Sequence, residues 1–338
     1  MNILAVESSC DETAVSVVRD GRIVLADCIA SQVALHREYG GVVPEIASRK
    51  HIEVIYSLAD EALTKAGVSR NDIDAVAVTY APGLIGAVLV GVNFAKAAAL
   101  ALNKPLIPVH HIKGHIAANY LAYPELKPPF LCLVVSGGHT MLVDVEDYTR
   151  MRILGTTLDD AAGECFDKVA RVLGMPYPGG ASLDRHAKLG DEKKYTLPRS
   201  RTGANLYDMS FSGLKTASLN LINHAQQLGE ELDVDGLCAS FSAAVSDTLI
   251  PRVALALNET GYTKLAVAGG VAANSRIRSD IMALADQKGI DVYLPPLHLC
   301  GDNAAMIGAQ AYYEFLSGNT ADMSLNAYAT KSILGEEM

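Results

Sequence analysis

The chain has 338 residues, of which 50% are hydrophobic and 20% are charged, with 28 glycines and no tryptophan. This length favours two domains or one large duplicated domain, and the composition is typical of a soluble α/β enzyme with tight strand-to-helix turns. The formal net charge of −10 argues against indiscriminate nucleic-acid binding, because affinity for phosphates grows with the number of cations placed against them.

The first residues and the cysteines indicate a cytoplasmic protein. Residues 1–7 lead directly into a strand-like run that carries an acid, so no signal peptide is predicted. The longest apolar stretch, 86–102, contains Asn93 and Lys96 and is rich in Gly and Ala. It predicts a buried helix packed closely on a sheet, since a membrane span needs a longer uncharged run. The six cysteines form no Cys-x-x-Cys pair, which is typical of a reducing compartment and argues against a zinc finger.

An unusual hairpin pattern occurs twice. Residues 3–18 read as two strands around a polar turn, and residues 130–145 repeat the design with a Ser-Gly-Gly-His turn. Hydroxyls and free amides at such turns hold phosphate oxygens, and an acid there holds a metal or a water. Each hairpin taken alone is compatible with a plain structural role. Two copies together predict a duplicated α/β domain with a cleft between the copies.

Helix and strand patterns alternate between the two hairpins. Residues 39–51 lead into a helix that runs to about Ala66, and residues 73–78 read as a buried strand. A turn at Pro82 and Gly83 precedes the apolar helix, and residues 106–109 read as another short strand.

Two histidines then share one helix face. His111 and His115 are four residues apart, so their rings can point to one place, and imidazole suits divalent transition metals. A third ligand is needed from elsewhere, and Asp302 at the start of a predicted helix is the best candidate. The alternative is that both histidines are surface residues, because this spacing also arises by chance.

The segments after the second hairpin suggest a nucleotide site. A helix from Gly163 places Asp167 at the edge of its apolar face, where it either enters a cleft or is simply exposed. Gly180 lies in a turn of two glycines, which lets a ligand approach the backbone or only permits the turn. Residues 265–274 read as a strand, a Gly-Gly turn and a helix start at Asn274, a usual place for a nucleotide. The full dinucleotide fingerprint is missing, so nicotinamide binding is not expected.

Two further features concern charge and helix continuity. Residues 181–216 contain seven cations and four acids, so this segment is +3 in a chain that is otherwise −13. It is either a local basic surface or a solvated loop. Residues 235–258 predict a long amphipathic helix with a kink or break at Pro251.

Eight motifs in order along nearly the whole chain resemble one family. They are Glu7-Ser-Ser-Cys-Asp-Glu-Thr13, His110-His-Ile-Lys-Gly-His115, Val135-Ser-Gly-Gly-His139, Asp159-Asp-Ala-Ala-Gly-Glu164 with Phe166-Asp-Lys168, Tyr177-Pro-Gly-Gly180, Phe211-Ser-Gly-Leu-Lys215, Ala268-Gly-Gly-Val271 with Asn274, and Asp302-Asn303. The family is TsaD (Gcp/YgjD), formerly called O-sialoglycoprotein endopeptidases. The resemblance implies the duplicated ribonuclease-H-like fold of the actin, heat-shock ATPase and sugar-kinase (ASKHA) superfamily. We expect lobes at 1–107, with the tail 320–338 packing back on it, and at 108–319.

The resemblance also implies a reaction. Family members transfer threonylcarbamoyl from threonylcarbamoyl-AMP, made by a separate synthase, to N6 of the adenosine just 3′ of the anticodon in tRNAs reading ANN codons. They form t6A in a cytoplasmic complex with TsaB and TsaE, away from membranes, and a homodimer is possible. One divalent metal ion per subunit, Fe²⁺ or Zn²⁺, is expected.

Site residues carry over from the family by position. The metal ligands implied are His111, His115 and Asp302. The adenylate-binding residues implied are Val134, Val135, Ser136, Gly137, Gly138, Asp167, Gly180, Asp184 and Asn274. Some relatives have a metal-approaching Tyr where Val134 stands, so here water or substrate would take the remaining metal positions. Asp11, Glu12 and His139 are candidates for the base that takes the amine proton, and the sequence does not choose among them.

Three other functions compete with this interpretation. A metallopeptidase of the His-Glu-x-x-His type needs a Glu after the first histidine, and here that residue is Ile112. An ATP-dependent kinase could share the fold, because fold alone does not fix function. A nucleotide-gated scaffold without enzymatic activity is the third alternative.

Overall fold

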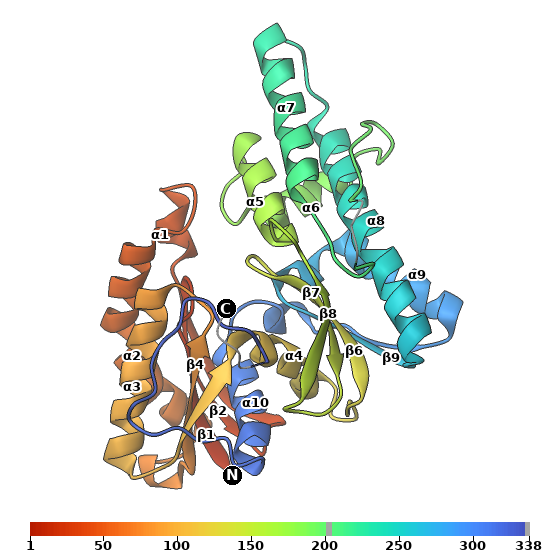
Figure 1. The fold of residues 1–338 in the computed structure, drawn as a ribbon. Helices are drawn as coiled ribbons and strands as arrows, with labels where there is room; N and C mark the ends of the chain where they lie inside the picture. The colour runs from red at the N-terminus through yellow and green to blue at the C-terminus, as the bar shows by residue number, and fades with distance from the viewer. Residues whose placement is uncertain (201–204, 335–338) are drawn as a thin grey trace. The chain divides into compact units, whose positions relative to one another are not determined.

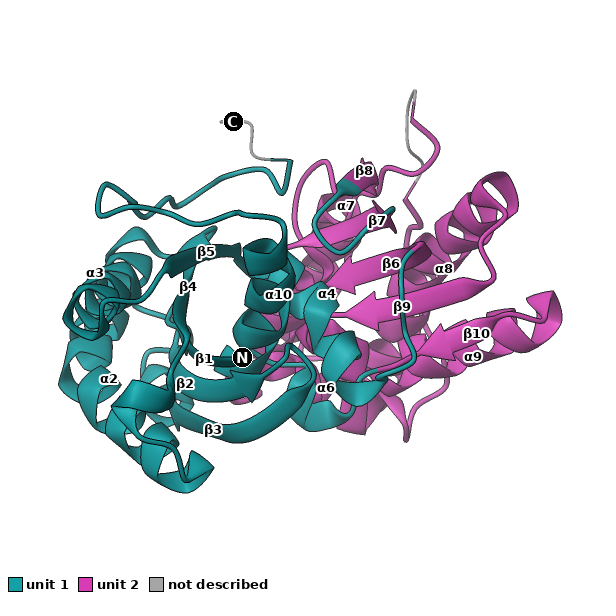
Figure 2. Ribbon diagram, turned by 90° about the horizontal axis from the view of Figure 1, so that it is seen from below, with its two compact units in different colours: residues 1–128, 146–151, 295–338 teal, residues 129–145, 152–294 magenta. Residues whose placement is uncertain are grey.

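The structure, a computed structural model, describes residues 1–200 and 205–334. The chain divides into two compact units, shown in different colours in Figure 2. Unit 1 comprises residues 1–128, 146–151 and 295–338, and unit 2 comprises residues 129–145 and 152–294. The histidine helix and the segment from residue 295 therefore group with the N-terminal part of the chain, whereas the expected lobe boundary lay at residue 107.

Unit 1 is built on a five-stranded sheet in the order β3-β2-β1-β4-β5. Its strands are β1 (Asn2–Glu7), β2 (Glu12–Arg19), β3 (Ile23–Ser31), β4 (Ala75–Ala81) and β5 (Leu106–His110). Its helices are α1 (Val33–Arg37), α2 (Pro44–Ala66), η1 (Arg70–Asp72), α3 (Ile85–Leu102), α4 (His111–Ala122), η3 (Leu297–Leu299) and α10 (Ala304–Leu316). The strand pair β1–β2 is antiparallel and β4 and β5 continue parallel to β1, so the predicted first hairpin is confirmed.

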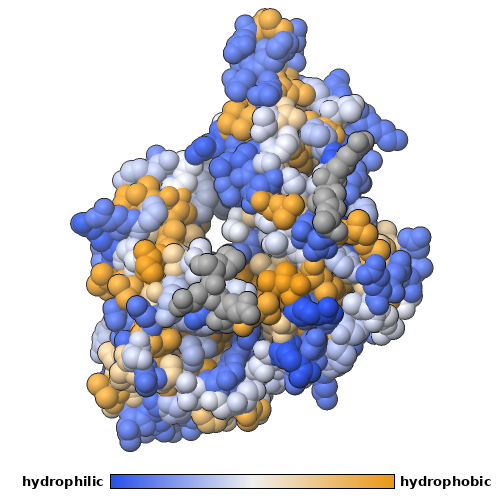
Figure 3. All heavy atoms as spheres, viewed as in Figure 1, coloured by the Kyte–Doolittle hydropathy of each residue, from blue (hydrophilic) through white to orange (hydrophobic). Residues whose placement is uncertain are grey.

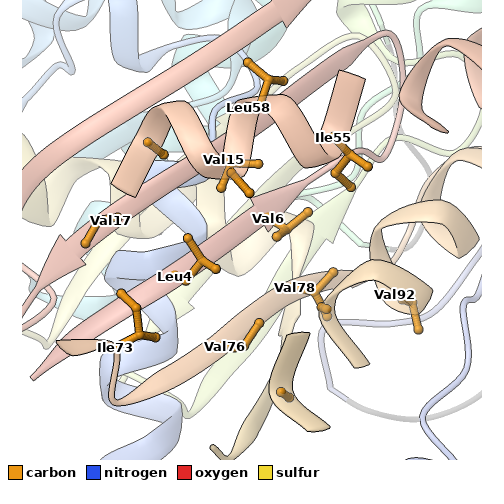
Figure 4. Packing of buried hydrophobic residues seen from close by; sticks show 14 of the residues in the cluster. Leu4, Val6, Val15, Val17, Ile55, Leu58, Ile73, Val76, Val78 and Val92 are labelled. Atoms are coloured by element: carbon orange, nitrogen blue, oxygen red, sulfur yellow. The ribbon is translucent and has the colours of Figure 1, made fainter. Parts of the chain in front are cut away.

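Helices cover both faces of this sheet (Figure 1). Alternate residues of a strand point to opposite faces. Leu4 and Val6 of β1 accordingly pack with α2 and α3 in the apolar cluster shown in Figure 4. Ile3 and Ala5 pack on the other face with α10 and α4. The central strands β1 and β4 are thus buried on both sides, and the strand ends are left to carry polar groups.

Unit 2 repeats the same plan. Its sheet has the order β8-β7-β6-β9-β10, with β6–β7 antiparallel and β9 parallel to β6. The strands are β6 (Phe130–Val135), β7 (Thr140–Val145), β8 (Met151–Thr156), β9 (Lys264–Ala268) and β10 (Asp291–Tyr293). The helices are α5 (Ala162–Val172), α6 (Gly179–Ala187), α7 (Ser212–Leu228), α8 (Val234–Thr260), η2 (Gly270–Ala273) and α9 (Ser275–Lys288). The matching strand order confirms the duplicated α/β fold.

Two helices differ from a simple surface helix. By length and composition alone α3 and α8 could cross a membrane, although core helices pass the same test. α8 is mostly buried, and it runs on through Pro251. Of the kink or break predicted at this proline, the break is therefore wrong. α3 packs on β4 as predicted, yet only 33% of its apolar window is buried within the protein.

Candidate functional site

The two histidines lie where β5 passes directly into α4. His110 ends the strand, and its ring nitrogen Nδ1 accepts a hydrogen bond from the backbone N–H of Ile112 at 3.2 Å, which caps the helix. His111 is therefore the first residue of α4, and His115 follows one turn later. Their ring centroids are 4.6 Å apart, and both side chains are buried. The shared helix face expected from the spacing is confirmed, and the alternative of two surface residues is wrong.

Asp302 completes a group of three potential ligands within unit 1. It precedes α10, whose cap Asn303 accepts a hydrogen bond from the N–H of Met306 at 2.8 Å. Asp302 Oδ1 lies 3.5 Å from Nε2 of His111 and 3.2 Å from Nε2 of His115. The three ligand atoms all lie within 4.8 Å of one another. Two imidazoles and one carboxylate converging in this way match a common divalent-metal arrangement.

The surroundings of His115 test whether a cation fits. Only 1% of this residue is exposed, and neither ring nitrogen makes a hydrogen bond to any residue in the described ranges. A buried polar nitrogen without a partner costs about 1–3 kcal/mol. A cation held between Nε2 and Asp302 would give that nitrogen a partner, so the residues present fit a metal ion.

Glu7 contacts His111 at Nδ1, the ring nitrogen that faces away from Asp302. This role was not identified from the sequence. Glu7 Oε2 lies 3.0 Å from Nδ1 of His111 and accepts the hydroxyl of Thr79 at 2.5 Å. Its Oε1 accepts the backbone N–H of Ser9 at 2.5 Å. When Nδ1–H donates to Glu7, the Nε2 lone pair of His111 is left for a metal. The one available signal was an acid at the end of an otherwise apolar strand.

The electrostatics of this cluster favour an added positive charge. Burial alone would lower the pKa of His111, but the carboxylates of Glu7 and Asp302 raise it to about 9. Burial alone would raise the pKa of Glu7, but His111 and the Thr79 hydroxyl bring it below its ordinary value. Two acids thus select for a cation, either a proton on His111 or a metal ion.

Close packing brings the two ligand-bearing helices together. A Cβ added at Gly114 would lie 2.6 Å from Cδ1 of Ile307, so the glycine lets α4 approach α10. Lys113 Nζ lies 3.3 Å from Oε1 of the buried Glu314 of α10. These contacts, which the sequence did not reveal, set the separation of His111 from Asp302.

The three candidate bases fall in different units. Asp11 is buried in the β1–β2 turn of unit 1. Glu12 begins β2, and its Oε1 accepts the hydroxyl of Ser31 at 2.8 Å. Burial raises the pKa of Glu12 to about 7. His139 belongs to unit 2, where its backbone N–H donates to the Ser136 hydroxyl at 3.1 Å.

The β6–β7 turn of unit 2 carries the first of the predicted adenylate-binding residues. Val134 and Val135 are buried in β6, while Gly137 and Gly138 are exposed and have open space where a Cβ would stand. A Cβ at Gly163 would lie 2.5 Å from the carbonyl oxygen of Ser136, so the start of α5 packs directly on the turn. The turn is supported on one side and open at its two glycines.

The remaining predicted adenylate residues link three helices of unit 2. Asp167 Oδ1 accepts the backbone N–H groups of Gly179 at 2.8 Å and Gly180 at 3.1 Å, which joins α5 to α6. Asp184 Oδ1 accepts the N–H and the hydroxyl of Ser275 at 2.9 and 2.7 Å, which joins α6 to α9. Asn274 caps α9 through its side-chain oxygen. These groups hold the helix ends together, and a role in ligand binding stays a prediction.

Three of the six described cations of residues 181–216 form ion pairs with acids. Lys188 pairs with Asp184 at 3.2 Å, Arg199 pairs with Asp247 at 2.8 Å, and Lys215 pairs with Asp160. Arg201 lies outside the described residues. This segment therefore offers less uncompensated positive charge than its composition indicates.

Comparison with known sequences shows a consistent match. The family described as "TsaD: tRNA N6-adenosine threonylcarbamoyltransferase" matches residues 23–309. A Moorella thermoacetica protein named tRNA N6-adenosine threonylcarbamoyltransferase is 55% identical over 96% of this chain and 95% of its own. A Clostridioides difficile protein of the same name is 52% identical over 96% of both chains.

Solved structures resemble the chain in fold. HypF of T. kodakarensis matches with a TM-score of 0.63 at 14% identity, over 96% of this chain and 49% of HypF. The Acidaminococcus fermentans (R)-2-hydroxyglutaryl-CoA dehydratase component A matches with a TM-score of 0.52 at 14% identity, over 93% of this chain and 98% of that one. With the repeated sheet order, these matches confirm the ASKHA-type fold.

Proposed function

Because the chain belongs to the TsaD family of tRNA N6-adenosine threonylcarbamoyltransferases, and is thus a transferase that forms t6A in tRNA, we propose how its residues carry out the transfer. The donor is threonylcarbamoyl-AMP from a separate synthase. The acceptor is N6 of the adenosine just 3′ of the anticodon in tRNAs reading ANN codons. His111, His115 and Asp302 would hold one Fe²⁺ or Zn²⁺ ion, which would assist the transfer.

The observation that carries this proposal is the buried His115 imidazole beside Asp302 and His111. Its ring nitrogens have no hydrogen-bond partner among the described residues, and Nε2 faces the same carboxylate oxygen as Nε2 of His111. A peptidase role has no such support, because Ile112 is buried and carries no base.

The protein needs to do little covalent chemistry, because the donor is an activated mixed anhydride with AMP as its leaving group. A bound divalent ion supplies Lewis-acid stabilisation of developing oxygen charge. Glu7 keeps His111 in the tautomer that presents Nε2. A base takes the amine proton, and of Asp11, Glu12 and His139 the pKa of about 7 suits Glu12 to that task.

Unit 2 is assigned to the adenylate. The exposed glycines of the β6–β7 turn allow a phosphate to approach the backbone closely, and the ends of α5, α6 and α9 frame the residues predicted for the nucleotide. This assignment is tested by measuring, with calorimetry, the affinity of the intact chain for a non-hydrolysable adenylate analogue. Equal affinity after Gly137→Val and Gly138→Val would contradict it.

Metal removal tests the proposed function directly. Chelation should abolish transfer from threonylcarbamoyl-AMP to a tRNA transcript in the presence of TsaB and TsaE, and added Fe²⁺ or Zn²⁺ should restore it. Mass analysis of the nucleosides measures the product. Full activity in protein shown to be metal-free would remove the ion from the reaction.

An exposed apolar face on α2 and α3 is proposed as the surface that binds TsaB. Ile52 and Tyr56 are 64% and 66% exposed, and Ile85 and Leu89 are 53% and 41% exposed. Figure 3 shows hydrophobic residues on the side of unit 1 where Figure 1 draws these helices. Large apolar side chains exposed on two adjacent helices are typical of protein–protein interaction surfaces.

Charge substitutions on this face test the proposed interface. Tyr56→Glu together with Ile85→Glu should abolish co-elution with TsaB and leave the fold intact. Leu228→Glu, at an exposed leucine of α7 in unit 2, is the control. Loss of a homodimer in the absence of TsaB would instead assign the face to self-association.

A further inference from the structure

The C-terminal strap, residues 321–331, runs along unit 1 without helix or extended strand (Figure 2). Ala321 bridges to β5 by donating its N–H to the carbonyl of Leu106 at 2.8 Å, and this covers the edge strand of the sheet. Lys96 of α3 donates to the carbonyl of Leu325 at 2.9 Å, and Ala327 is buried in the apolar core. The strap is therefore fixed to unit 1 along its first half.

The second half of the strap contacts a loop that supports His111. The N–H of Gly83 donates to the carbonyl of Ala329 at 3.2 Å, and the next N–H, that of Leu84, donates to the carbonyl of Ser9 at 2.8 Å. The Ser9 hydroxyl lies 3.2 Å from Nδ1 of His111. One side of the histidine is thus connected to the strap through three hydrogen bonds in series.

The strap also holds the residue before His111. His110 Nδ1 accepts the N–H of Ile112, so the ring proton is on Nε2 and donates to the carbonyl of Lys331 at 2.9 Å. Lys331 is anchored in turn, because its ammonium lies 5.3 Å from the ring centre of Tyr80 and 4.4 Å from that of Tyr328. The strap ends where the helix that bears both histidines begins.

We propose that the C-terminal strap is a positioning element of the metal centre, which fixes His111 from both sides through Gly83 and His110. This inference rests on the proposed metal site. It assigns a task in that site to a segment that supplies no ligand and lies outside the matched family region, 23–309.

The test measures Zn²⁺ affinity of the full chain and of variants by competition with a chromophoric chelator. A chain that ends after Asn326 lacks both carbonyl acceptors and should bind Zn²⁺ roughly 10- to 100-fold more weakly, as expected when support of a ligand is lost. Lys331→Ala, which removes the anchor alone, should weaken binding about two- to fivefold. A chain that ends after Leu334 keeps the strap and should bind like the full chain.

A matched control separates positioning from general loss of stability. Ile55→Ala leaves a cavity in the α2 core of unit 1 while keeping every hydrogen bond of the strap, and should lower the melting temperature without lowering Zn²⁺ affinity. Full-chain affinity in the shortened chain, or an equal loss in Ile55→Ala, would overturn the inference. If the shortened chain does not fold, unchanged affinity in Lys331→Ala overturns it.

Failure of the metal site itself gives a different result. In that case the full chain and the double variant His111→Ala with His115→Ala bind Zn²⁺ equally. This outcome would overturn the proposed function and the strap inference together, whereas loss of binding in the double variant alone leaves the strap variants to decide.

Discussion

Each unit has its own sheet with the same strand order, and each sheet has a turn between its first two strands. The two turns are built differently. In unit 1 the β1–β2 turn is closed: Ser8 and Ser9 are nearly fully buried, the Ser8 hydroxyl donates to the carbonyl of Ala87, and the N–H of Ser9 donates to Glu7. In unit 2 the β6–β7 turn is open, because Gly137 and Gly138 are exposed with free space beside them.

The difference shows that a duplicated sheet supplies positions and the turn residues supply the chemistry. In unit 1 the polar groups of the turn form hydrogen bonds within the protein. One of them supports Glu7, which contacts His111, and this arrangement suits a cation. Phosphate binding by the Ser8 and Ser9 groups, one option from the sequence, has no support from these contacts. In unit 2 the backbone is left accessible, which suits an anionic ligand.

Removal of both histidines should give the largest effect, and it should abolish the metal site of unit 1 without affecting unit 2. His111→Ala with His115→Ala is expected to lower transfer at least about 100-fold, because a bound metal contributes several kcal/mol of charge stabilisation. Adenylate binding should persist. Activity, metal content and analogue affinity measure this, with the exposed His224→Ala as control. Loss of analogue binding in the folded double variant would show that the two chemistries are not separate.

Glu7→Gln sharpens the comparison without changing a ligand. The His111 ring loses its charged partner, so Zn²⁺ affinity should fall roughly 10- to 100-fold. The pKa of His111 should fall as well, because burial is then opposed by Asp302 alone. Chelator competition and NMR titration of the metal-free protein measure the two effects. An unchanged pKa of His111 in this variant would show that Glu7 does not cause the raised pKa.

Stability of the metal-free protein should depend on pH through unit 1. Because the pKa of His111 is raised in the fold from 6.5 to about 9, its stabilisation is complete below pH 6.5 and is lost as pH rises through about 9. The loss should be on the order of 3 kcal/mol. Urea unfolding between pH 6 and 10 measures it, and the His111→Ala variant, which should lose less stability over this range, is the control.

Substitution of two glycines of unit 2 should have different effects, one on stability and the other on adenylate binding. Gly163→Ala places a Cβ against the Ser136 carbonyl and should cost about 1–3 kcal/mol of stability. Gly137→Ala meets no neighbouring atom and should leave stability nearly unchanged while weakening adenylate binding. Thermal unfolding and calorimetry separate the two. Normal ligand binding in Gly137→Ala would show that the open turn does not contact the adenylate.

The smallest effect is expected at Arg199. Its ion pair with Asp247 is partly exposed, so Arg199→Glu should change stability by no more than about 0.5–1 kcal/mol. A tRNA contact would lower the slope of log affinity against log salt by about one. We expect an unaltered slope, because the cation is already matched. A reduced slope in filter-binding titrations would restore residues 181–216 as a tRNA surface.

Local patterns in the sequence predicted the features that depend on local geometry. Helical spacing predicted that His111 and His115 share a face, and alternation predicted both hairpins. Asp302 was placed correctly at the start of a helix. The pairing of Glu7 with His111 could not be predicted, because it depends on how β1 and β4 meet the start of α4.

Ion pairs between residues far apart in the chain also could not be predicted from the sequence. Asp247 lies 48 residues from Arg199, so counting charges within residues 181–216 overstated the local positive charge. Pro251 was expected to kink or break a helix, and α8 continues through it without a break. The helix is buried around much of its surface, and that packing outweighs the local preference.

Unit 1 is assembled from both ends of the chain, with unit 2 inserted between residues 128 and 295. During synthesis the ribosome releases all of unit 2 before it releases α10, so unit 2 can complete its core while unit 1 still lacks a helix over one face of its sheet. The carboxylate of Asp302 emerges 187 residues after His115. Binding of a metal ion by all three proposed ligands would therefore require that translation has passed residue 302, just before the last core helix.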